Sequence, residues 1–512
     1  MKTKIKILLM FCFIMGFTAC NLDEDPYGFY SEDNFYKSSE DAKAAINYAY
    51  ATLTYLEYSR ALVFLGDMPT EIMTTKSDAA TDNQSLNLWK TDNFNTNGTL
   101  MNFFKYSYIA INRANAIIKK LPGTDMPDDL RNQYMGEAYF LRAYNYYYLS
   151  CNFGLVPIHK GVVETLDQTS APLAASMDEL YDFIIEDLKL AEELMPVYST
   201  PTMGRVDKVA AQALLAKTYL TIASGKENGV LLFKDMNKDV NSMYEEAKKY
   251  AGRVMGFDPA YPQHTYGFEN DLLKIYDIDN FNGKENIFLM SMDRTGESEG
   301  QYSKISKMYI PYIDGATIWL KQGDSNEYIK SHDGWGEYRT EIGFYNSYDN
   351  DDKRKTDLIV NKIYSEDGTL KAEWTPTGGK IPYPFCRKFI DPKFDGDKTS
   401  TRPYLIRYSE IALAYAEAAG PTSEAYSAVN FVRNRAGLGN LISGLNTTDF
   451  REAVYKERKY ELAFEGAYLY DLRRLNRIKD IQEVKNMGLN ESQYTFYPIP
   501  QSEINLNPSL RP

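Results

Sequence analysis

The chain has 512 residues, enough for two or three average domains or for one large fused unit. Hydrophobic residues make up 44% and charged residues 25%, a balance that is typical of folded proteins and argues against an intrinsically disordered chain. The net charge of −13 argues against nucleic-acid binding, which needs clustered Lys and Arg, and suits a neutral or cation-assisted ligand.

The first twenty residues have the pattern of a secretory signal. Three lysines precede the apolar run Ile7–Phe17, which is too short to span a membrane as a helix. The run ends in Phe-Thr-Ala-Cys, Phe17–Cys20, which resembles a bacterial lipobox. This resemblance implies that a signal peptide of residues 1–19 is removed and that Cys20 is lipidated. An ordinary signal with a chance cysteine is the alternative.

Acidic residues follow Cys20 directly, in Asn-Leu-Asp-Glu-Asp. They resemble the surface-export tag of Bacteroidota lipoproteins, which implies a lipid-anchored protein on the exterior of the outer membrane. Several acyl chains anchor durably, because each buried methylene contributes about 0.8 kcal/mol. Retention on the periplasmic leaflet is the alternative.

The region from residue 20 to 260 is predicted to be mostly helical. Apolar residues recur at three- and four-residue spacing, and turn signals such as Leu-Pro-Gly and Asn-Phe-Gly separate the periodic stretches. In chain order the predicted helices are Ser38–Tyr58, Leu100–Leu121, Asp128–Asn152, Met177–Met195, Asp207–Ser224 and Ser242–Met255.

A change in composition marks the segment 261–400, which is rich in Gly, Pro, Asp, Tyr and Trp. Short runs such as Asn286–Met290 predict loops and small strands that a helical frame carries. Helical periodicity returns in 401–512, and we expect this region to fuse with the N-terminal helices into one globule. Its predicted helices are Pro403–Ala419, Thr422–Ala436 and Asp449–Glu465.

Two pairs of predicted helices repeat a similar alanine-rich pattern. Ala213–Leu220 and Tyr244–Ala251 form one pair, and Ile411–Ala418 and Ser423–Val429 form the other. Small alanines let antiparallel helices approach closely, and the second unit resembles tetratricopeptide repeats, which bury their apolar faces only by stacking. We therefore expect a mainly α fold, in which tetratricopeptide-like helix pairs form a superhelical frame around the loop-rich insert.

Three glutamates at four-residue spacing, Glu457, Glu461 and Glu465, stand beside Arg458 and three later arginines. On one helix these carboxylates point the same way, so they cannot face each other across a sugar as the two carboxylates of a glycosidase do. They repel one another unless cations neutralise them, and Arg458 is expected to reach Glu461. The stretch therefore predicts a structural network of ion pairs.

Other chemical signals are sparse. The three histidines include no two at the spacing of a zinc site. The acidic runs Asp349–Asp352 and Asp391–Asp397 lack EF-hand spacing, so solvated turns are favoured over structural calcium, and no other cofactor is expected. Cys151 and Cys386 either form one disulfide or remain two buried free thiols.

Six motifs follow one another along the chain and together resemble the signatures of the SusD/RagB family. No single motif is decisive, but the ordered set spans the chain. They are Arg142–Tyr144 with Asn152–Ile158, Gly204–Ala211, Leu405–Ile411, Val429–Gly437, Tyr455–Leu475, and Phe496–Ile504 with Asn507 and Pro508.

The resemblance implies a non-catalytic surface lipoprotein that binds glycan. Such a protein sits on a SusC-like TonB-dependent outer-membrane transporter and contacts the membrane through its lipid anchor only. The implied fold is a mostly helical frame of tetratricopeptide-like pairs with ligand-holding loops inserted.

None of the four tryptophans falls in a predicted helix. Flat indole rings stack on the C–H faces of sugar rings, while Asn, Asp and Tyr side chains bond sugar hydroxyls. In the family, the ligand surface combines a loop before the long N-terminal helix pair with loops of the middle segment. These positions are not part of a fixed motif, so the resemblance predicts the region of the ligand surface and not its individual residues. The predicted ligand residues are Trp89, Trp319 and Trp335, followed by Asp67, Asn93, Tyr302 and Tyr309.

Two other functions compete with glycan binding. A secreted glycosidase would need paired carboxylates in the aromatic segment, where Asp333 and Glu337 beside Trp335 are the best candidates. A helical-repeat scaffold for proteins or peptides would not need tryptophan-bearing loops. For each tryptophan, core filling is the alternative role.

Overall fold

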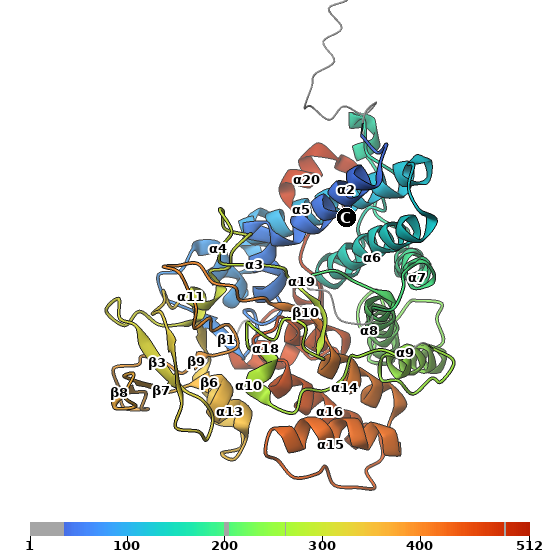
Figure 1. Cartoon of the computed structure of the whole chain (residues 1–512). Helices are drawn as coiled ribbons and strands as arrows, with labels where there is room; N and C mark the ends of the chain where they lie inside the picture. Colours follow the sequence, from blue (N-terminus) through green and yellow to red (C-terminus); the bar gives the residue numbers. More distant parts are fainter. Residues whose placement is uncertain (1–34, 199–203, 262, 486–487, 512) are drawn as a thin grey trace, which may run out of the picture.

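The computed structural model describes residues 35–511 apart from 199–203, 262 and 486–487. The predicted signal peptide and Cys20 lie outside these described residues. Helices dominate the described chain and the strands are short, so the mainly α prediction is confirmed (Figure 1). No helix among the described residues combines the length and the apolar character that crossing a membrane requires.

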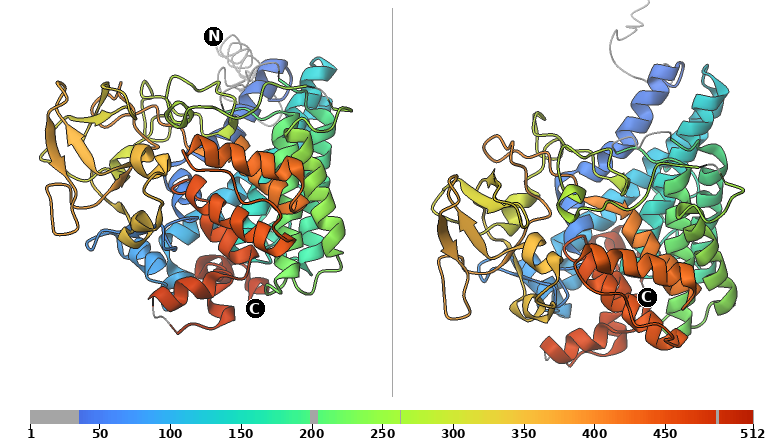
Figure 2. Two further views of the ribbon diagram at one scale, coloured as in Figure 1. Left: turned by 90° about the horizontal axis from the view of Figure 1, so that it is seen from below. Right: turned by 60° about the horizontal axis from the view of Figure 1, so that its bottom comes forward.

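The N-terminal half is a stack of helices in which α5 to α9 pack pairwise in chain order (Figures 1 and 2). Its elements are α2 (Ser39–Ala51), α3 (Leu56–Phe64), β1 (Met73–Thr75), α4 (Thr81–Asn87), α5 (Gly98–Lys120), α6 (Asp128–Phe153), α7 (Met177–Leu194), α8 (Lys208–Glu227) and α9 (Val240–Val254).

Side-chain caps explain where these helices begin. At the start of α5, Asn97 accepts hydrogen bonds from two backbone N–H groups, and Asp207 does the same at the start of α8. The prediction of one helix over Ser38–Tyr58 is wrong, because a short 3₁₀ turn at Thr52–Thr54 separates α2 from α3. There the Thr54 hydroxyl donates to a backbone carbonyl and so competes with helix continuation.

The middle segment carries most of the strands, and its four-stranded sheet lies at the side of the molecule opposite α6 to α9 (Figure 2). Four antiparallel strands form its largest sheet, in the order β4-β3-β7-β8. Its elements are α10 (Leu272–Ile275), β2 (Asn286–Leu289), α11 (Ile305–Tyr309), β3 (Ile318–Lys321), β4 (Tyr328–Ser331), β5 (Tyr338–Thr340), α12 (Ile342–Ser347), α13 (Lys353–Leu358), β6 (Ile359–Val360), β7 (Lys362–Tyr364), β8 (Leu370–Glu373) and β9 (Phe385–Cys386).

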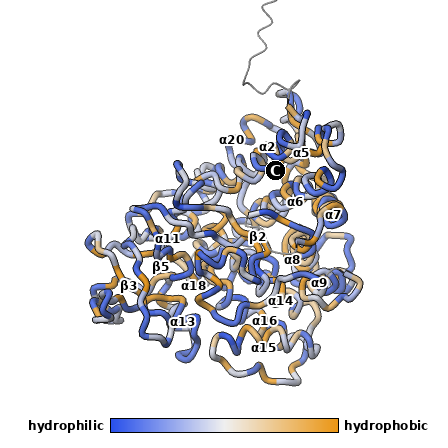
Figure 3. The backbone as a smooth tube through the Cα atoms, viewed as in Figure 1, coloured by the Kyte–Doolittle hydropathy of each residue, from blue (hydrophilic) through white to orange (hydrophobic). Residues whose placement is uncertain are grey.

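The C-terminal helices close the frame, because α14 packs on α9 as well as on α15. The two alanine-rich pairs therefore stack on each other, and apolar residues recur along these helices (Figure 3). The elements are β10 (Tyr404–Arg407), α14 (Tyr408–Ala419), α15 (Ser423–Arg435), α16 (Thr447–Glu461), α17 (Tyr468–Arg474), α18 (Ile478–Lys485), α19 (Glu491–Tyr494) and α20 (Gln501–Leu506).

Helix α16 ends at Glu461, four residues before the predicted end at Glu465. The chain then turns back through Gly466, whose φ is 75°. A Cβ on Gly66 would lie 1.8 Å from the Gly466 carbonyl oxygen, so the two backbones cross at a distance that only glycine permits. The N-terminal and C-terminal halves are joined at this crossing.

Candidate ligand-binding surface

The glutamates of α16 lie in a buried ion-pair network. Glu461 is 1% exposed and accepts hydrogen bonds from Arg407 at 2.8 Å and Arg435 at 2.7 Å. Burial alone raises the pKa of Glu461, but the surrounding arginines, Arg354 among them, outweigh burial and hold it well below the usual value. The network joins β10, α13, α15 and α16, so the prediction of a structural role is consistent with its geometry.

The predicted pairing of Arg458 with Glu461 is wrong. Arg458 binds Asp471 instead, with Nε 2.8 Å from one carboxylate oxygen. The cause is the turn after α16, which folds α17 back so that Asp471 faces Arg458 while Glu461 faces other elements.

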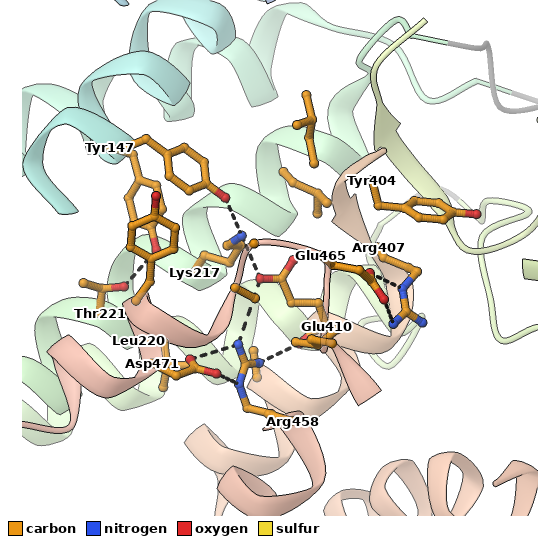
Figure 4. Close-up of a pocket in the computed structure, with 18 of the residues that line it drawn as sticks. Tyr147, Lys217, Leu220, Thr221, Tyr404, Arg407, Glu410, Arg458, Glu465 and Asp471 are labelled. Atoms are coloured by element: carbon orange, nitrogen blue, oxygen red, sulfur yellow. Dashed lines mark hydrogen bonds and ion pairs between the residues drawn. The ribbon is translucent and has the colours of Figure 1, made fainter. Parts of the chain in front are cut away.

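A small polar pocket lies beside this network, between α8, α14 and α17 (Figure 4). Its volume is about 40 Å³, which is room for ordered water but far below the 300 Å³ or more of a typical ligand pocket. Its ionic groups already pair with one another, as Lys217 does with Glu410 at 2.7 Å. The pocket therefore has neither the space nor the free groups to hold a sugar.

Three of the predicted ligand residues lie in the core. Trp89 is 2% exposed, its indole N–H donates to the Pro69 carbonyl at 2.7 Å, and its ring stacks on Tyr497. Asp67 is fully buried. Tyr309 is 1% exposed and stacks on Phe389. The prediction that these three contact ligand is corrected, because no sugar can reach groups enclosed in this way.

Trp335, in contrast, presents 41% of its surface. Its loop is held to α11 by backbone hydrogen bonds, since Trp335 N–H donates to the Lys307 carbonyl at 2.7 Å and Gly336 N–H to that of Ile310 at 2.9 Å. A Cβ on Gly334 would lie 2.0 Å from the Ile310 oxygen, so glycine is required there. The exposed ring is thus carried on a rigid backbone.

Tyr312 stands on the adjacent loop and is 67% exposed. The carbonyl of its neighbour Pro311 accepts the Gly334 N–H at 3.0 Å, which ties the two loops together. Tyr312 is not among the ligand residues that the sequence predicts. Its position two residues before the turn signal Asp314-Gly315 marks it as a loop residue, but nothing in the sequence says that it is exposed.

Tyr302 completes this aromatic group through a shared lysine. Lys304 Nζ lies 5.8 Å from the ring centre of Trp335 and 5.7 Å from that of Tyr302. We call Tyr302, Lys304, Tyr312 and Trp335 the Trp335 platform. Lys304, which also pairs with Glu299 at 3.6 Å, lies beside the rings of Trp335 and Tyr302, and Tyr312 joins the group through the backbone bond between the two loops.

The loops before α5 reach this part of the molecule. The family resemblance predicts that such a loop and the loops of the middle segment together form the ligand surface. Strand β1 pairs with β5, directly after the Trp335 loop. Arg60 of α3 pairs with Glu299 at 2.7 Å, and Lys76 pairs with Glu337 at 3.3 Å. Asn93, however, is exposed on the connection between α4 and α5 and donates to Ser85, so it is not part of the Trp335 platform.

Trp319 lies apart from the Trp335 platform, in the middle of β3. Its side chain is half-buried and lies on the face of the sheet opposite the buried Ile318 and Leu320. Lys330 of β4 and Tyr364 of β7 are its cross-strand partners there. The two tryptophans therefore belong to different surfaces.

The carboxylates proposed for a glycosidase have other partners. Asp333 is 8% exposed and accepts the N–H groups of Ile313 and Gly315, which shapes the Tyr312 loop. Glu337 pairs with Lys76.

The acidic runs considered for calcium are similarly engaged. Asp352 binds Arg354 at 2.7 Å, Asp391 accepts the Ser400 N–H at 2.7 Å, and Asp397 pairs with Lys307. Within the described ranges, no group of three or more His, Cys, Asp or Glu side chains could hold a metal ion. Cys151 and Cys386 are both free and buried, so the disulfide alternative is wrong.

Comparison with known proteins matches both halves of the chain. A model described as the SusD family matches residues 284–511, and one described as starch-binding associating with outer membrane matches residues 23–220. SusD-like protein P2 of Formosa agariphila is 26% identical over 100% of this chain and 99% of its own.

Two solved structures have the same fold. A SusD homolog from Bacteroides thetaiotaomicron has a TM-score of 0.74 at 22% identity, covering 94% of this chain and 98% of its own. A laminarin binding SusD-like protein has a TM-score of 0.73 at 22% identity, covering 92% and 98%. With family models on both halves and this fold throughout, the chain belongs to the SusD/RagB family.

Proposed function

We propose that this chain is a non-catalytic glycan-binding lipoprotein of the outer membrane. Lipidated Cys20 anchors it, facing the exterior, and it delivers oligo- or polysaccharide to a SusC-like TonB-dependent transporter. The anchor rests on the lipobox, and the transporter partnership rests on family membership. The matching model's description as associating with outer membrane supports the location.

The observation that carries glycan binding is the Trp335 platform. Trp335 and Tyr312 expose 41% and 67% of their surfaces on loops that backbone hydrogen bonds hold together. Isolated exposed aromatics are ordinary, but two exposed rings on loops that are tied together, with Lys304 beside one of them, offer faces for C–H stacking and a donor for hydroxyls. The fold neighbour that binds laminarin makes a sugar ligand a natural expectation.

The absence of catalysis is proposed for a geometric reason. Asp333 and Glu337, which flank Trp335 in the sequence, are committed to backbone N–H groups and to Lys76, and the glutamates of α16 are buried in ion pairs. A glycosidase needs one carboxyl group free to donate a proton and another free to attack or to activate water. The helical-scaffold alternative has no specific observation in its favour.

Electrophoresis through gels that contain single polysaccharides tests binding, and a reducing-sugar assay on the same panel tests catalysis. We expect retardation by at least one polymer and no release of reducing ends. Release of reducing ends by wild type that is lost in Asp333→Asn would establish the glycosidase. No retardation by any polymer would contradict glycan binding.

A further inference from the structure

A second cavity lies between the four-stranded sheet and helices α12 and α13, separate from the Trp335 platform. Its volume is about 400 Å³. Four cationic side chains line it, against one carboxylate, that of Asp357. The cations are Lys321, Lys355, Lys362 and Arg387. This local excess of positive charge stands in a chain whose net charge is −13.

Arg387 is the most informative of these residues because it is only 6% exposed. Its guanidinium donates to the Lys321 carbonyl and to the Gln322 side-chain oxygen, which are both neutral acceptors. Within the part of the chain that the structure describes, no carboxylate pairs with it within 4.0 Å. Burial lowers the pKa of Arg387 to about 10, and Asp357 and Asp271 offset this only in part. A buried cation without an adjacent anion favours the binding of one.

The other cations differ in how far they are committed. Lys355 donates to Asn350 at 3.0 Å, and Lys362 pairs with Glu373 at 3.2 Å on the surface. Lys321 is half-buried and its backbone carbonyl is the one that Arg387 holds. Asp357 accepts the Thr356 hydroxyl, and burial raises the pKa of its carboxyl group. It is one carboxylate against the four cations of the lining. Positive charge therefore prevails in the cavity.

Aromatic rings adjoin this positive charge. Tyr364 lines the cavity and is the cross-strand partner of Trp319 between β7 and β3. Its ring centre lies 5.0 Å from that of Tyr328. Lys321 follows Trp319 by two residues on β3 and so points to the same face of the sheet. A sugar ring on Trp319 or Tyr364 would place its substituents at the mouth of the cavity.

We propose that this cavity is a second glycan subsite, which takes the anionic substituent, carboxylate or sulfate ester, of an acidic sugar. Arg387 and Lys321 bind the anion, and Trp319 and Tyr364 pack against the sugar ring. The inference rests on the proposed function and narrows it to a substrate class, acidic glycans. It also assigns Trp319 to a different subsite from Trp335.

The test is affinity electrophoresis of the detergent-purified lipoprotein at low salt. The gels contain polygalacturonate, alginate, carrageenan or heparin, and each polymer is compared with its neutral counterpart, made by carboxyl reduction or desulfation. At least one acidic polymer should retard the protein more than its neutral counterpart does. That excess should weaken roughly tenfold in Lys321→Gln and in Arg387→Gln, the loss expected for a charge-assisted hydrogen bond. Lys321→Gln keeps the test valid if Arg387→Gln unfolds. Lys371→Gln, which removes an exposed charge of β8 outside the cavity, should bind like wild type.

The outcomes separate this inference from the proposed function. One outcome is that the protein binds neutral polymers, that only Trp335→Ala weakens this binding, and that acidic polymers retard the protein no more than their neutral counterparts. The proposed function then holds and the acidic subsite is wrong. The second experiment compares the melting temperature in sulfate with that in chloride at equal ionic strength. Stabilisation by sulfate that Lys321→Gln removes supports the anion site. If free sulfate binds as tightly as the best polymer, the site takes a free anion and the glycan assignment is overturned. No response to sulfate or to any acidic polymer overturns the anion site as well.

Discussion

The carboxylate of Asp67 accepts the backbone N–H of Gly466 at 2.9 Å, which joins residues 399 positions apart. It also accepts the N–H of Tyr468 at 3.2 Å. Asp67 therefore holds the glycine crossing that connects the two halves of the frame. A group predicted to bind sugar instead fixes the fold.

The position of Asp67 predicts a pH dependence of stability. Burial raises its pKa from 3.8 to about 7, against the two N–H groups that lower it. Between these values the folded state holds a proton that the unfolded state has lost, so its contribution to stability falls as the pH rises. The change amounts to about 4 kcal/mol. In Asp67→Asn this component should be absent, as urea unfolding at pH 4 and pH 8 will measure. Exposed Asp92→Asn is the control, and equal pH slopes in wild type and Asp67→Asn would refute the assignment.

Glu461→Gln and Arg458→Met should each lower the free energy of unfolding by about 2 to 4 kcal/mol, because each takes one partner from a buried ion-pair network and leaves an imbalance of charge there. Glu245→Gln is the control, since it breaks a surface pair with Lys248 in which the glutamate is 70% exposed, and it should cost less than about 1 kcal/mol. Denaturant unfolding measures all three. Loss of glycan binding at an unchanged unfolding free energy would mean that the α16 glutamates act on ligand after all.

Trp335→Ala and Tyr312→Ala should each weaken glycan binding about thirtyfold, the loss of roughly 2 kcal/mol that is typical of an aromatic hot spot. Stability should change little, because both side chains are largely exposed. Phe257→Ala is a matched control, as its ring is 46% exposed and packs on Tyr415 of the helical frame. Calorimetry with a polymer that retards the wild type gives the affinities. Wild-type affinity in both platform variants would place the site elsewhere.

Trp89→Ala should lower the free energy of unfolding by about 3 to 5 kcal/mol, because it empties a core position and leaves the Pro69 carbonyl without its donor. The folded fraction should bind glycan like the wild type. Trp89→Phe separates the two contributions, since it keeps most of the volume and loses the N–H. An affinity loss in Trp89→Ala without a loss of stability would restore Trp89 as a ligand residue.

Cys20→Ala should leave the body folded and release it from membranes. Fractionation of cells that lack the proposed partner transporter measures this directly, and circular dichroism checks the fold. A mutant that stays with the outer membrane in such cells would show that the lipobox is not the anchor.

Most of the helical frame could be predicted because its signals are local. Periodic apolar residues, the caps Asn97 and Asp207, and the alanine-rich pairs each act within a few residues of the helix they define. The structural role of the α16 glutamates also followed from local geometry, since carboxylates on one face of a helix cannot oppose each other. Their partners could not be predicted, because Arg407 and Arg435 come from other elements.

The amino-acid sequence by itself determined the class of the fold, and it predicts a lipobox and the part of the chain where ligand loops belong. Only the tertiary structure decided which aromatic rings face solvent. Trp89 is covered by Tyr497, and Tyr309 by Phe389, through contacts between segments far apart in the chain, whereas Tyr312 is left open. The net charge of −13 likewise gives no indication of the cationic cavity, whose charged residues come from separate elements. Exposure and local electrostatics depend on what packs nearby in space, and neighbours in sequence do not specify it.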